Sequence, residues 1–442
     1  MKKAHQITKS GLFLIFFLLP TLFFGQKNIS TNLAKYMQAQ VEINNFSGAV
    51  IVTKNGSVLL KKAYGLADYE WNIKNTVDTK FQLASVTKQF TATAILQLVA
   101  KGELSLDDKL SKFFPDYPKA DSVTIHMLLS HSSGLGLGFK ELALTTISAD
   151  SAYNEIKKIP YEFTPGTQSE YSNIGYYLLG KIIEKVSGEK YAVYLKKNIF
   201  EKVGMKNTGV SNNDSIILRK AKAYHITENG YIHNPYINWG FNLGHDGVYS
   251  TVEDLALWDQ ALYGTTILST EMKKQMFTSY NNQSYGYGLM INPFYNHGHQ
   301  LIAHDGGFFG TMTSFNRFTD DKIFVTVLSN NESPSYIIGY ALSAIALQKE
   351  VELPYKHHQI KADITQYDNY TGKYGEIEII KNGEKLFYNS LEMELLPESK
   401  TKFFRADNND RTIEFIQNKS GIYNSIILTK GGVKEIITKS NP

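Results

Sequence analysis

Ser85-Val86-Thr87-Lys88 opens the run Ser85–Lys101 (SVTKQFTATAILQLVAK), which is the most informative feature of this chain. Apolar side chains occur nearly all round the helix that this run predicts, so we expect a buried central helix. A serine and a lysine at this spacing lie on one face of a helix, about one turn apart. Burial disfavours the ammonium form of Lys88, which lowers its pKa and makes the amine a usable base. Backbone N–H groups at the start of the helix suit a developing oxyanion beside Ser85.

The Ser-x-x-Lys spacing is not specific by itself, because it recurs at Ser187…Lys190 and Ser399…Lys402. Gly188 marks a helix end within the second copy, and the third copy lies in a polar stretch near the C-terminus. Only the copy at Ser85 opens a long apolar run. The alternative for this copy is a solvated serine and lysine at a helix start, and other motifs must decide between the two interpretations.

The chain begins with a basic segment, followed by the apolar run Gly11–Phe24 and the small residue Gly25. The basic residues are Lys2, Lys3 and Lys9. This pattern predicts a signal peptide over residues 1–25, because the run is short for a membrane-spanning helix. We therefore expect a mature chain from near Gln26, exported to the periplasm or to the outside of the cell. An uncleaved N-terminal anchor is the alternative.

The composition excludes several kinds of site. The chain has no cysteine, which removes disulfides, thiol catalysis and cysteine metal sites. The net charge of +4 falls to about +1 without the lysines of the predicted signal peptide, so neither nucleic acid nor a strongly anionic partner is indicated. A clamp that holds a carboxylate with two hydrogen bonds must use one of four arginines: Arg219, Arg317, Arg405 or Arg411.

Strand patterns occur at both ends of residues 26–350, with helical patterns between them. Gly48–Thr53 and Val58–Tyr64 alternate around the turn signal Asn55-Gly56. Further strands are expected at Tyr285–Ile291, Gln300–His304, Thr311–Phe318 and Ile323–Ser329. Further helices are expected at Thr31–Asn44, Ile174–Val186, Tyr191–Val203, Thr251–Leu262 and Ser335–Glu350. One sheet built from distant segments, in a mixed α/β domain over residues 26–350, accounts for this order.

The character of the sequence changes after about Tyr367. Short alternating stretches separated by turn signals follow, at Ile377–Ile380, Lys385–Tyr388, Phe403–Arg405, Thr412–Ile416 and Ser425–Thr429. This pattern predicts a small antiparallel barrel or sandwich over residues 366–442. Residues 351–365 are the expected linker between the two domains.

Two further motifs carry side chains that could act together with Ser85. Tyr171-Ser172-Asn173 lies between the loop Pro165-Gly166-Thr167 and a predicted helix. His304-Asp305-Gly306-Gly307 follows an apolar strand pattern, and its glycines let a ligand or another backbone come close. A rival copy, His245-Asp246-Gly247, leads into another predicted helix and is interpreted as a loop, one that could line the same cleft.

In the order Ser-x-x-Lys, Tyr-x-Asn, His-x-Gly, the chain resembles the penicillin-recognising serine hydrolases, and specifically their class C β-lactamase-like branch. That branch includes D,D-peptidases, D-aminopeptidases and family VIII-type esterases. The resemblance runs from about Phe46 to Leu347 and includes Phe81–Ala84, Leu104–Asp108, Leu128–Leu135, Gly247–Thr251 and Tyr287–Leu289. It implies a β-lactamase/transpeptidase-like domain with an antiparallel sheet and a helical region. The C-terminal segment resembles the small all-β domain often appended to this branch.

The resemblance also implies roles for individual residues. Ser85 is expected to be the acylated nucleophile, Lys88 its proton acceptor, and Tyr171 the partner base that also protonates the leaving group. The expected substrate-binding residues are Asn173, His304, Gly306 and Gly307. Backbone N–H groups of Ser85 and Gly307 would form the oxyanion hole. Because a tyrosine normally has a pKa of about 10, its action as a base requires nearby cations, for which Lys88 and His304 are the candidates.

The third motif departs from the family pattern. β-Lactamases and many D,D-peptidases carry a lysine where this chain has His304, which is expected to be largely neutral near pH 7. The following residue, Asp305, is expected to add a negative charge. The change favours esters, or peptides bound by another end, over penicillin-type and D-Ala-D-Ala carboxylates. Arg317, on the adjoining strand pattern, is the arginine placed to compensate.

The leading hypothesis is a secreted serine hydrolase of the esterase or D-amino-acid peptidase type, which forms an acyl-enzyme at Ser85 and uses no cofactor or metal. Its partner would be a small ester, amide or peptide substrate. The alternative within the family is a β-lactamase or D,D-carboxypeptidase. The alternative from another class is a catalytically silent protein that binds cell-wall or peptide ligands. A metallohydrolase is disfavoured because His297-Gly298-His299 flanks a predicted strand without a metal-binding pattern.

Overall fold

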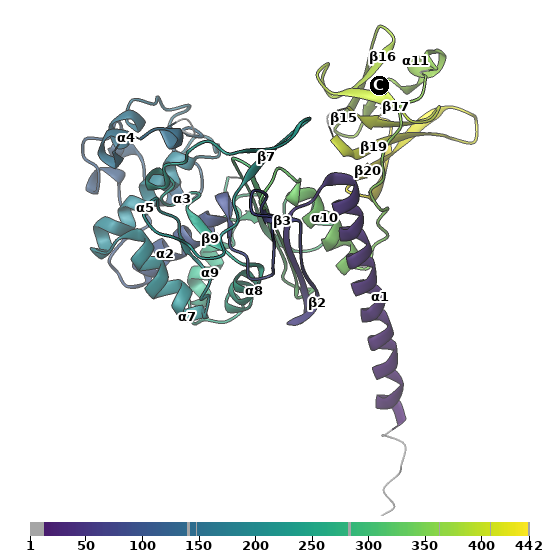
Figure 1. Ribbon diagram of the computed structural model, residues 1–442. Coiled ribbons are helices and arrows are strands. Elements are labelled where there is room, and N and C mark those ends of the chain that lie inside the picture. The colour runs from purple at the N-terminus through teal and green to yellow at the C-terminus, as the bar shows by residue number, and fades with distance from the viewer. Residues whose placement is uncertain are drawn as a thin grey trace, which may run out of the picture.

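The computed structural model describes residues 13–138, 142–146, 148–281, 284–361, 363–406 and 408–440. Residues 1–12 of the predicted signal peptide lie outside this described part. Among the described residues, no helix has both the length and the apolar character needed to cross a membrane. Figure 1 shows a region of mixed helices and strands, a mainly β region above it on the right, and a long N-terminal helix, α1 (Phe13–Asn44), beside them.

A six-stranded antiparallel sheet joins the two ends of the mixed region. Its strand order is β10-β11-β12-β13-β1-β2. The strands are β1 (Gly48–Lys54), β2 (Ser57–Tyr64), β10 (Met290–Ile291), β11 (Leu301–Phe308), β12 (Thr311–Phe318) and β13 (Ile323–Ser329). β1 pairs with β13 along its whole length, from Gly48 opposite Ser329 to Lys54 opposite Ile323. The prediction of one sheet built from distant segments is therefore confirmed.

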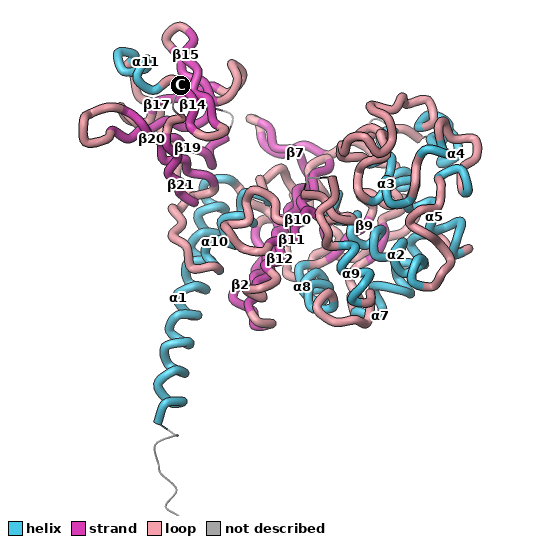
Figure 2. The backbone as a smooth tube through the Cα atoms, turned by 180° about the vertical axis from the view of Figure 1, so that it is seen from behind, coloured by secondary structure: helices cyan, strands magenta, loops and turns pink. Residues whose placement is uncertain are grey.

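Helices cover both faces of this sheet (Figures 1 and 2). α10 (Ser335–Ala346) and the second half of α1 pack on one face, and α8 (Val252–Ala261) packs on the other. Successive residues of β1 enter opposite cores: Ala49 and Ile51 face the helical region, whereas Val50 and Val52 lie under α10 and α1. Because both faces are buried, the central strands are continuous apolar runs rather than alternating ones.

The rest of the mixed region is built around α2 (Lys88–Ala100), which is buried on nearly every side as its sequence predicts. The other helices here are α3 (Ile125–Leu129), α4 (Ala149–Ile156), α5 (Asn173–Ser187), α6 (Tyr191–Leu195), α7 (Glu201–Val203) and α9 (Thr270–Met276). The short strands are β3 (Leu66–Asp68), β4 (Ile73–Lys74), β5 (Phe81–Gln82), β6 (Gly209–Val210), β7 (Tyr224–Thr227), β8 (Gly230–His233) and β9 (Val248–Ser250).

Two predicted elements next to the start of α2 differ from the structure. The helix does not start at Ser85: a 3₁₀ turn, η1 (Ala84–Thr87), precedes α2, and Ala84 has a left-handed φ of 47°. The strand expected at Tyr285–Ile291 is reduced to β10. Gly288 explains the loss, because it has φ of 70° and a Cβ there would lie 2.6 Å from the carbonyl oxygen of Lys88. The chain must loop over the start of α2 at this point and cannot run as a straight strand.

The C-terminal region is an eight-stranded antiparallel sheet in sequential order, preceded by α11 (Tyr367–Tyr370). Its strands are β14 (Gly372–Tyr374), β15 (Ile377–Asn382), β16 (Lys385–Tyr388), β17 (Glu394–Pro397), β18 (Lys402–Arg405), β19 (Asn408–Gln417), β20 (Tyr423–Lys430) and β21 (Val433–Thr438). A bridge between Tyr374 and Lys439 brings the first and last strands together, so the sheet nearly closes into a barrel. The predicted small β domain is therefore present, with Tyr370 and Phe415 stacked in its core.

Candidate active site

Ser85 lies in η1, in the short turn between β5 and α2. The backbone of this turn is held from the side by the strands β11 and β12. Thr313 Oγ1 donates a hydrogen bond of 2.9 Å to the carbonyl oxygen of Leu83, and a Cβ at Gly306 would lie only 2.5 Å from that oxygen. Ala84 has a left-handed φ, which changes the direction of the backbone just before Ser85. Ser85 therefore lies where the six-stranded sheet meets α2.

Lys88, the first residue of α2, has a fully buried side chain that reaches the nucleophile candidate. Its Nζ lies 2.9 Å from Ser85 Oγ and donates a longer hydrogen bond of 3.3 Å to the carbonyl oxygen of His245. Burial lowers the pKa of Lys88 to about 8, and the carboxylate of Asp246 counteracts part of this fall. The amine can therefore take up and release a proton near neutral pH.

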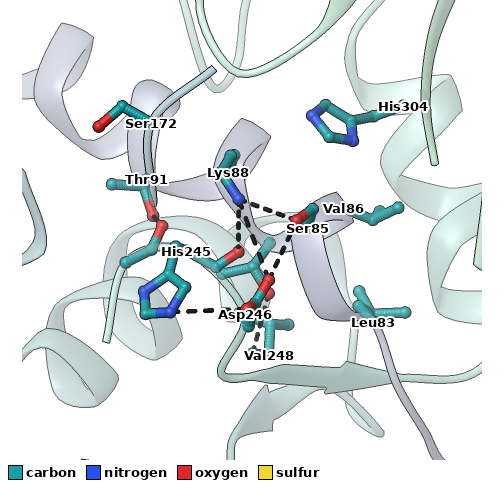
Figure 3. A network of polar contacts seen from close by, with 12 residues as sticks. Leu83, Ser85, Val86, Lys88, Thr91, Ser172, His245, Asp246, Val248 and His304 are labelled. Atoms are coloured by element: carbon teal, nitrogen blue, oxygen red, sulfur yellow. Dashed lines mark hydrogen bonds and ion pairs between the residues drawn. The ribbon is translucent and has the colours of Figure 1, made fainter. Parts of the chain in front are cut away.

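Asp246 is the residue of this site that the sequence analysis missed as a chemical group. Its Oδ1 accepts a hydrogen bond of 3.1 Å from Ser85 Oγ and lies 3.9 Å from Lys88 Nζ. Its Oδ2 lies 3.5 Å from Nε2 of His245, whose pKa burial lowers. Figure 3 shows these contacts converging below Ser85. The only sequence signal was the second His-Asp-Gly, which had been interpreted as a loop that could line the same cleft, and it does line that cleft.

Tyr171 lies just before α5, and its ring contacts a lysine and a histidine. Lys88 Nζ is 4.8 Å from the ring centroid, and the ring of His131 stacks on the tyrosine ring at 4.5 Å. Burial raises the pKa of Tyr171 well above its usual value, while the nearby Ser85 hydroxyl acts in the opposite direction. Tyr171 Oη has no hydrogen-bond partner among the described residues, so the phenol remains available to a substrate.

The ring of His131, on which Tyr171 stacks, is neutral and held in one orientation. Its Nδ1 accepts the backbone N–H of Ser172 at 3.0 Å, so the ring proton must sit on Nε2. Burial and the nearby Lys88 lower the pKa of His131 well below its usual value. Ser172 also caps α5 by accepting the backbone N–H of Gly175 at 2.9 Å. Because Ser172 is held by these two hydrogen bonds, the backbone of the adjoining Tyr171 has little conformational freedom.

A pocket of about 400 Å³ opens over Ser85. Its polar lining consists of Ser85, Tyr171, Asn173, Asn242, His245 and Asp246, and its apolar lining includes Leu137, Ala143 and Phe308. Asn173 Oδ1 is buried without a hydrogen-bond partner among the described residues, so it can accept a hydrogen bond from a ligand. The structure thus brings Ser85, Tyr171 and Asn173 around one cavity, and the buried Lys88 reaches Ser85 from outside its lining.

Three residues of β11 were predicted to bind substrate, and the structure places them in different surroundings. Gly307 lines the pocket, whereas Gly306 is buried against the backbone before Ser85 and permits that close approach. His304 is also buried: its Nδ1 donates 2.6 Å to the carbonyl oxygen of Asp305, and its Nε2 has no partner among the described residues. Burial and Lys88 lower the pKa of His304 to about 4, so it does not supply the cation that was expected beside Tyr171.

Two charges assigned from the sequence are corrected by the structure. Asp305 follows His304 on a strand, so it points to the opposite face, where Tyr295 Oη donates a hydrogen bond of 3.0 Å to its Oδ2. It therefore does not add its charge to the pocket. Arg317 cannot compensate there either, because its Nε donates 2.5 Å to Oδ1 of Asp259 in the core. Among the pocket-lining and adjoining side chains described above, Lys88 is the basic group that contacts Ser85.

Comparison with known proteins agrees with this geometry. A family model described as Beta-lactamase matches residues 33–348. Penicillin-binding protein 4* of Bacillus subtilis (strain 168) is 28% identical over 93% of this chain and 99% of its own length. Esterase EstB of Burkholderia gladioli is 34% identical over 40% of this chain and 50% of its own length. The structure of the octameric penicillin-binding protein homologue from Pyrococcus abyssi has a TM-score of 0.67 and 27% identity, and covers 92% of this chain and 99% of that one.

Proposed function

Because the chain belongs to the beta-lactamase family and is a serine hydrolase of that family, we propose that it forms an acyl-enzyme at Ser85 on an ester or amide substrate. The observation that carries the proposal is the 2.9 Å contact between Ser85 Oγ and the Nζ of the buried Lys88 at the floor of a pocket. A hydroxyl within hydrogen-bond reach of an amine whose pKa is lowered to about 8 is an activated nucleophile.

In the first step Ser85 Oγ attacks the substrate carbonyl carbon, and its proton passes to the neutral amine of Lys88. The carboxylate of Asp246 lies 3.9 Å from Lys88 Nζ and favours the ammonium that forms. The negative charge of the tetrahedral intermediate collects on the former carbonyl oxygen. Backbone N–H groups of Ser85 and Gly307 are the proposed donors to that oxygen.

In the second step the bond from the carbonyl carbon to the leaving oxygen or nitrogen breaks, and the leaving group needs a proton. Tyr171 is the proposed donor because burial keeps it a phenol, and the Lys88 ammonium beside its ring can return the proton. A water molecule then attacks the acyl carbon, giving up a proton to the same pair as the acid is released and Ser85 regains its hydrogen. This assignment makes Lys88 the first base and Tyr171 the acid.

The substrate class that the pocket favours is an ester or amide without a carboxylate next to the scissile bond. His304 is neutral and Arg317 is committed to Asp259, so neither supplies the fixed cation that would hold such a carboxylate. The esterase relative supports the same choice. We therefore place esterase or D-amino-acid peptidase activity ahead of β-lactamase or D,D-carboxypeptidase activity.

We also propose that the protein is exported. The basis is the sequence pattern of Lys2, Lys3 and Lys9 before the apolar run Gly11–Phe24. N-terminal sequencing of material from fractionated cells tests this, with a start near Gln26 as the expected result. Recovery of intact chains that begin at Met1 in the membrane fraction would contradict cleavage.

Covalent labelling tests the proposed nucleophile. A fluorophosphonate should add to the peptide that contains Ser85, and the Ser85→Ala variant should lose this label. Ser187→Ala is the matched control, because Ser187 shares the Ser-x-x-Lys spacing but donates its hydroxyl to the carbonyl oxygen of Ile183 at a helix end. A Ser85→Ala variant that is still labelled would refute the assignment. A wild-type protein that is neither labelled nor active on p-nitrophenyl esters would favour the silent binding protein.

A further inference from the structure

A second pocket, of about 330 Å³, adjoins the one over Ser85. Phe308 lines both pockets, so the two cavities share a wall made by the end of β11. The second pocket is lined by aromatic rings and by amide side chains: Tyr236, Trp239, Phe309, Gln82, Asn213 and Asn234. Such a lining suits a ligand with an apolar or aromatic body and a polar end.

Lys220 supplies a positive charge to this second pocket. Its Nζ donates a hydrogen bond of 2.7 Å to Ser211 Oγ and lies 4.7 Å from the ring centroid of Trp239. Within the described part of the chain, no carboxylate forms an ion pair with Lys220. Burial lowers its pKa to about 8, so the group is still mainly an ammonium at neutral pH. A largely buried ammonium without a carboxylate partner is stabilised by an anion that enters beside it.

The second pocket is connected to the proposed catalytic residues by hydrogen bonds. Ser211 Oγ donates 2.8 Å to Gln82 Oε1, and Gln82 Nε2 donates 2.7 Å to the backbone carbonyl oxygen of Asp246. Asp246 in turn accepts the hydroxyl of Ser85. This chain of contacts holds Lys220 at a fixed position relative to Ser85, as is needed if one substrate is to touch both.

We propose that the Lys220 pocket binds a substrate carboxylate remote from the scissile bond, carried on an apolar or aromatic group, while the ester or amide carbonyl lies at Ser85. The inference rests on the proposed function, since it assigns a substrate class to that site. It is consistent with the absence of a usable cation at His304 and Arg317, because the carboxylate is recognised at the other end of the substrate. Trp239 supplies the aromatic surface, and Asn234 Oδ1, which is buried without a hydrogen-bond partner among the described residues, can accept a hydrogen bond from the substrate.

Equilibrium binding tests the pocket without any turnover. In the Ser85→Ala background, 4-phenylbutanoate and its neutral analogue 4-phenylbutanamide are titrated by calorimetry. We expect the carboxylate to bind more tightly than the amide, and Lys220→Met to weaken the carboxylate by about ten- to a hundredfold with a much smaller effect on the amide. Lys222→Met is the matched control, because Lys222 pairs with Asp68 at 3.0 Å on the surface. Equal binding of the two ligands, or the same loss for both in Lys220→Met, would overturn the proposal.

Turnover then connects the pocket to the chemistry. The p-nitrophenyl monoester of suberic acid carries a remote carboxylate, and p-nitrophenyl octanoate is its neutral partner. Lys220→Met is expected to lower kcat/KM for the monoester by about tenfold relative to the octanoate, and Lys220→Arg is expected to retain most of the preference. Failure of the proposed function would remove both activities and the Ser85 label, whereas failure of this inference alone would leave both esters hydrolysed and equally affected. Unchanged monoester preference in Lys220→Met would overturn it.

Discussion

The same Ser-x-x-Lys spacing stands in both regions of the molecule, at Ser85 before α2 and at Ser399 between β17 and β18. At the first, both side chains meet at 2.9 Å and the lysine is fully buried. At the second, Ser399 Oγ accepts the backbone N–H of Lys402 at 2.9 Å, and Lys402 Nζ donates 2.8 Å to Tyr355 Oη. In the turn, the hydroxyl of Ser399 bonds to the backbone of the turn itself. Before α2, the hydroxyl of Ser85 contacts the lysine side chain instead.

The electrostatic surroundings of the two lysines differ as much as their geometry. The side chain of Lys402 is 22% exposed and lies within 3.9 Å of the carboxylates of Glu352 and Glu398. Lys88 is desolvated and has one carboxylate, that of Asp246, at 3.9 Å. Desolvation is what turns a lysine into a base near neutral pH, so spacing alone does not make a catalytic pair.

The largest effect should come from removing the lysine in the mixed region. Lys88→Met is expected to lower kcat/KM for p-nitrophenyl esters by about a hundred- to ten-thousandfold, because Ser85 loses its proton acceptor. Lys402→Met, the matched change in the C-terminal region, should leave the rate nearly unchanged. The measurement is steady-state hydrolysis together with the rate of fluorophosphonate labelling. A Lys88→Met variant that keeps more than about a tenth of the wild-type rate would show that another group accepts the proton.

Much of the mixed region follows from local sequence patterns. The hairpin β1–β2 carries its turn at Asn55-Gly56, and β12 and β13 have the bounds that their apolar runs predict. In the C-terminal region β14, β17 and β21 were missed, because these strands have little apolar alternation and are recognised only by pairing with their neighbours. The hairpin β7–β8 was missed although Asn229-Gly230 signals its turn.

The partners of the site residues could not be read from local patterns. Asp246 meets Ser85 across a sequence separation of 161 residues, and Arg317 meets Asp259 across 58, so only the packed fold brings them together. Burial produces the neutral state of His304, and no local motif encodes burial of that kind. The strand expected at Gln300–His304 continues to Phe308 in the structure, and side chains alternate along it, so His304 and Asp305 face opposite sides of the sheet.

A second, smaller effect should follow from changing the carboxylate beside Lys88. The rate should rise with pH through about 8 in the wild type, because Lys88 must lose its proton to act as a base. Asp246 favours the ammonium, so Asp246→Asn should lower the pKa of Lys88 further and move this limb to lower pH. The lost hydrogen bond to Ser85 should also reduce the plateau rate by about tenfold.

The pH dependence of kcat/KM, measured from pH 5 to pH 10, checks the role of Asp246. Asp305→Asn is the control, since the carboxyl group of Asp305 bonds to Tyr295 on the opposite face and should leave the limb where it is. An Asp246→Asn profile with an unmoved limb would mean that the carboxylate does not act on Lys88. A shift of this limb to higher pH would also contradict the proposed action of Asp246 on Lys88.

A third effect concerns the neutral histidine in the wall of the site. His304→Lys should raise nitrocefin hydrolysis relative to ester hydrolysis by about tenfold, because it adds a cation that can bind the carboxylate of nitrocefin. Adding Asp305→Thr should bring no further gain, since Asp305 faces away. In the wild type, lowering the pH from 8 to 6 should not favour carboxylate substrates, because burial holds the pKa of His304 at about 4.

Competition between nitrocefin and p-nitrophenyl butyrate measures this ratio directly, with His297→Lys as a matched change outside the pocket. His297 stacks on Tyr340 at 4.2 Å and should leave the ratio unaltered. Efficient nitrocefin hydrolysis by the wild-type protein at about pH 8, where an unperturbed histidine is neutral, would reveal a further cation at the site. The β-lactamase alternative would then replace the esterase one.

The smallest effect should come from the contact through which the C-terminal region approaches the site. Lys430, at the end of β20, lies 4.4 Å from the ring centroid of Phe294 and 5.4 Å from that of Tyr340. Burial raises the pKa of Asp305 to about 6, and the charge of Lys430 acts in the opposite direction. Next to it, Tyr36 Oη donates 3.2 Å to the carbonyl oxygen of Gly431. The two regions therefore share an interface, and the C-terminal sheet is less separable than its self-contained strands suggest.

Lys430→Met should lower the melting temperature by about 2–4 °C while changing kcat/KM by less than about threefold, because the cation packs on rings that do not line the pocket. Thermal unfolding and ester hydrolysis of the same preparation measure both. Lys434→Met is the control, since Lys434 forms only a surface pair with Glu352 at 3.1 Å. If Lys430→Met lost more than about tenfold in kcat/KM at unchanged stability, the C-terminal region would take part in the chemistry through Tyr295 and Asp305. The two regions would then form one functional unit.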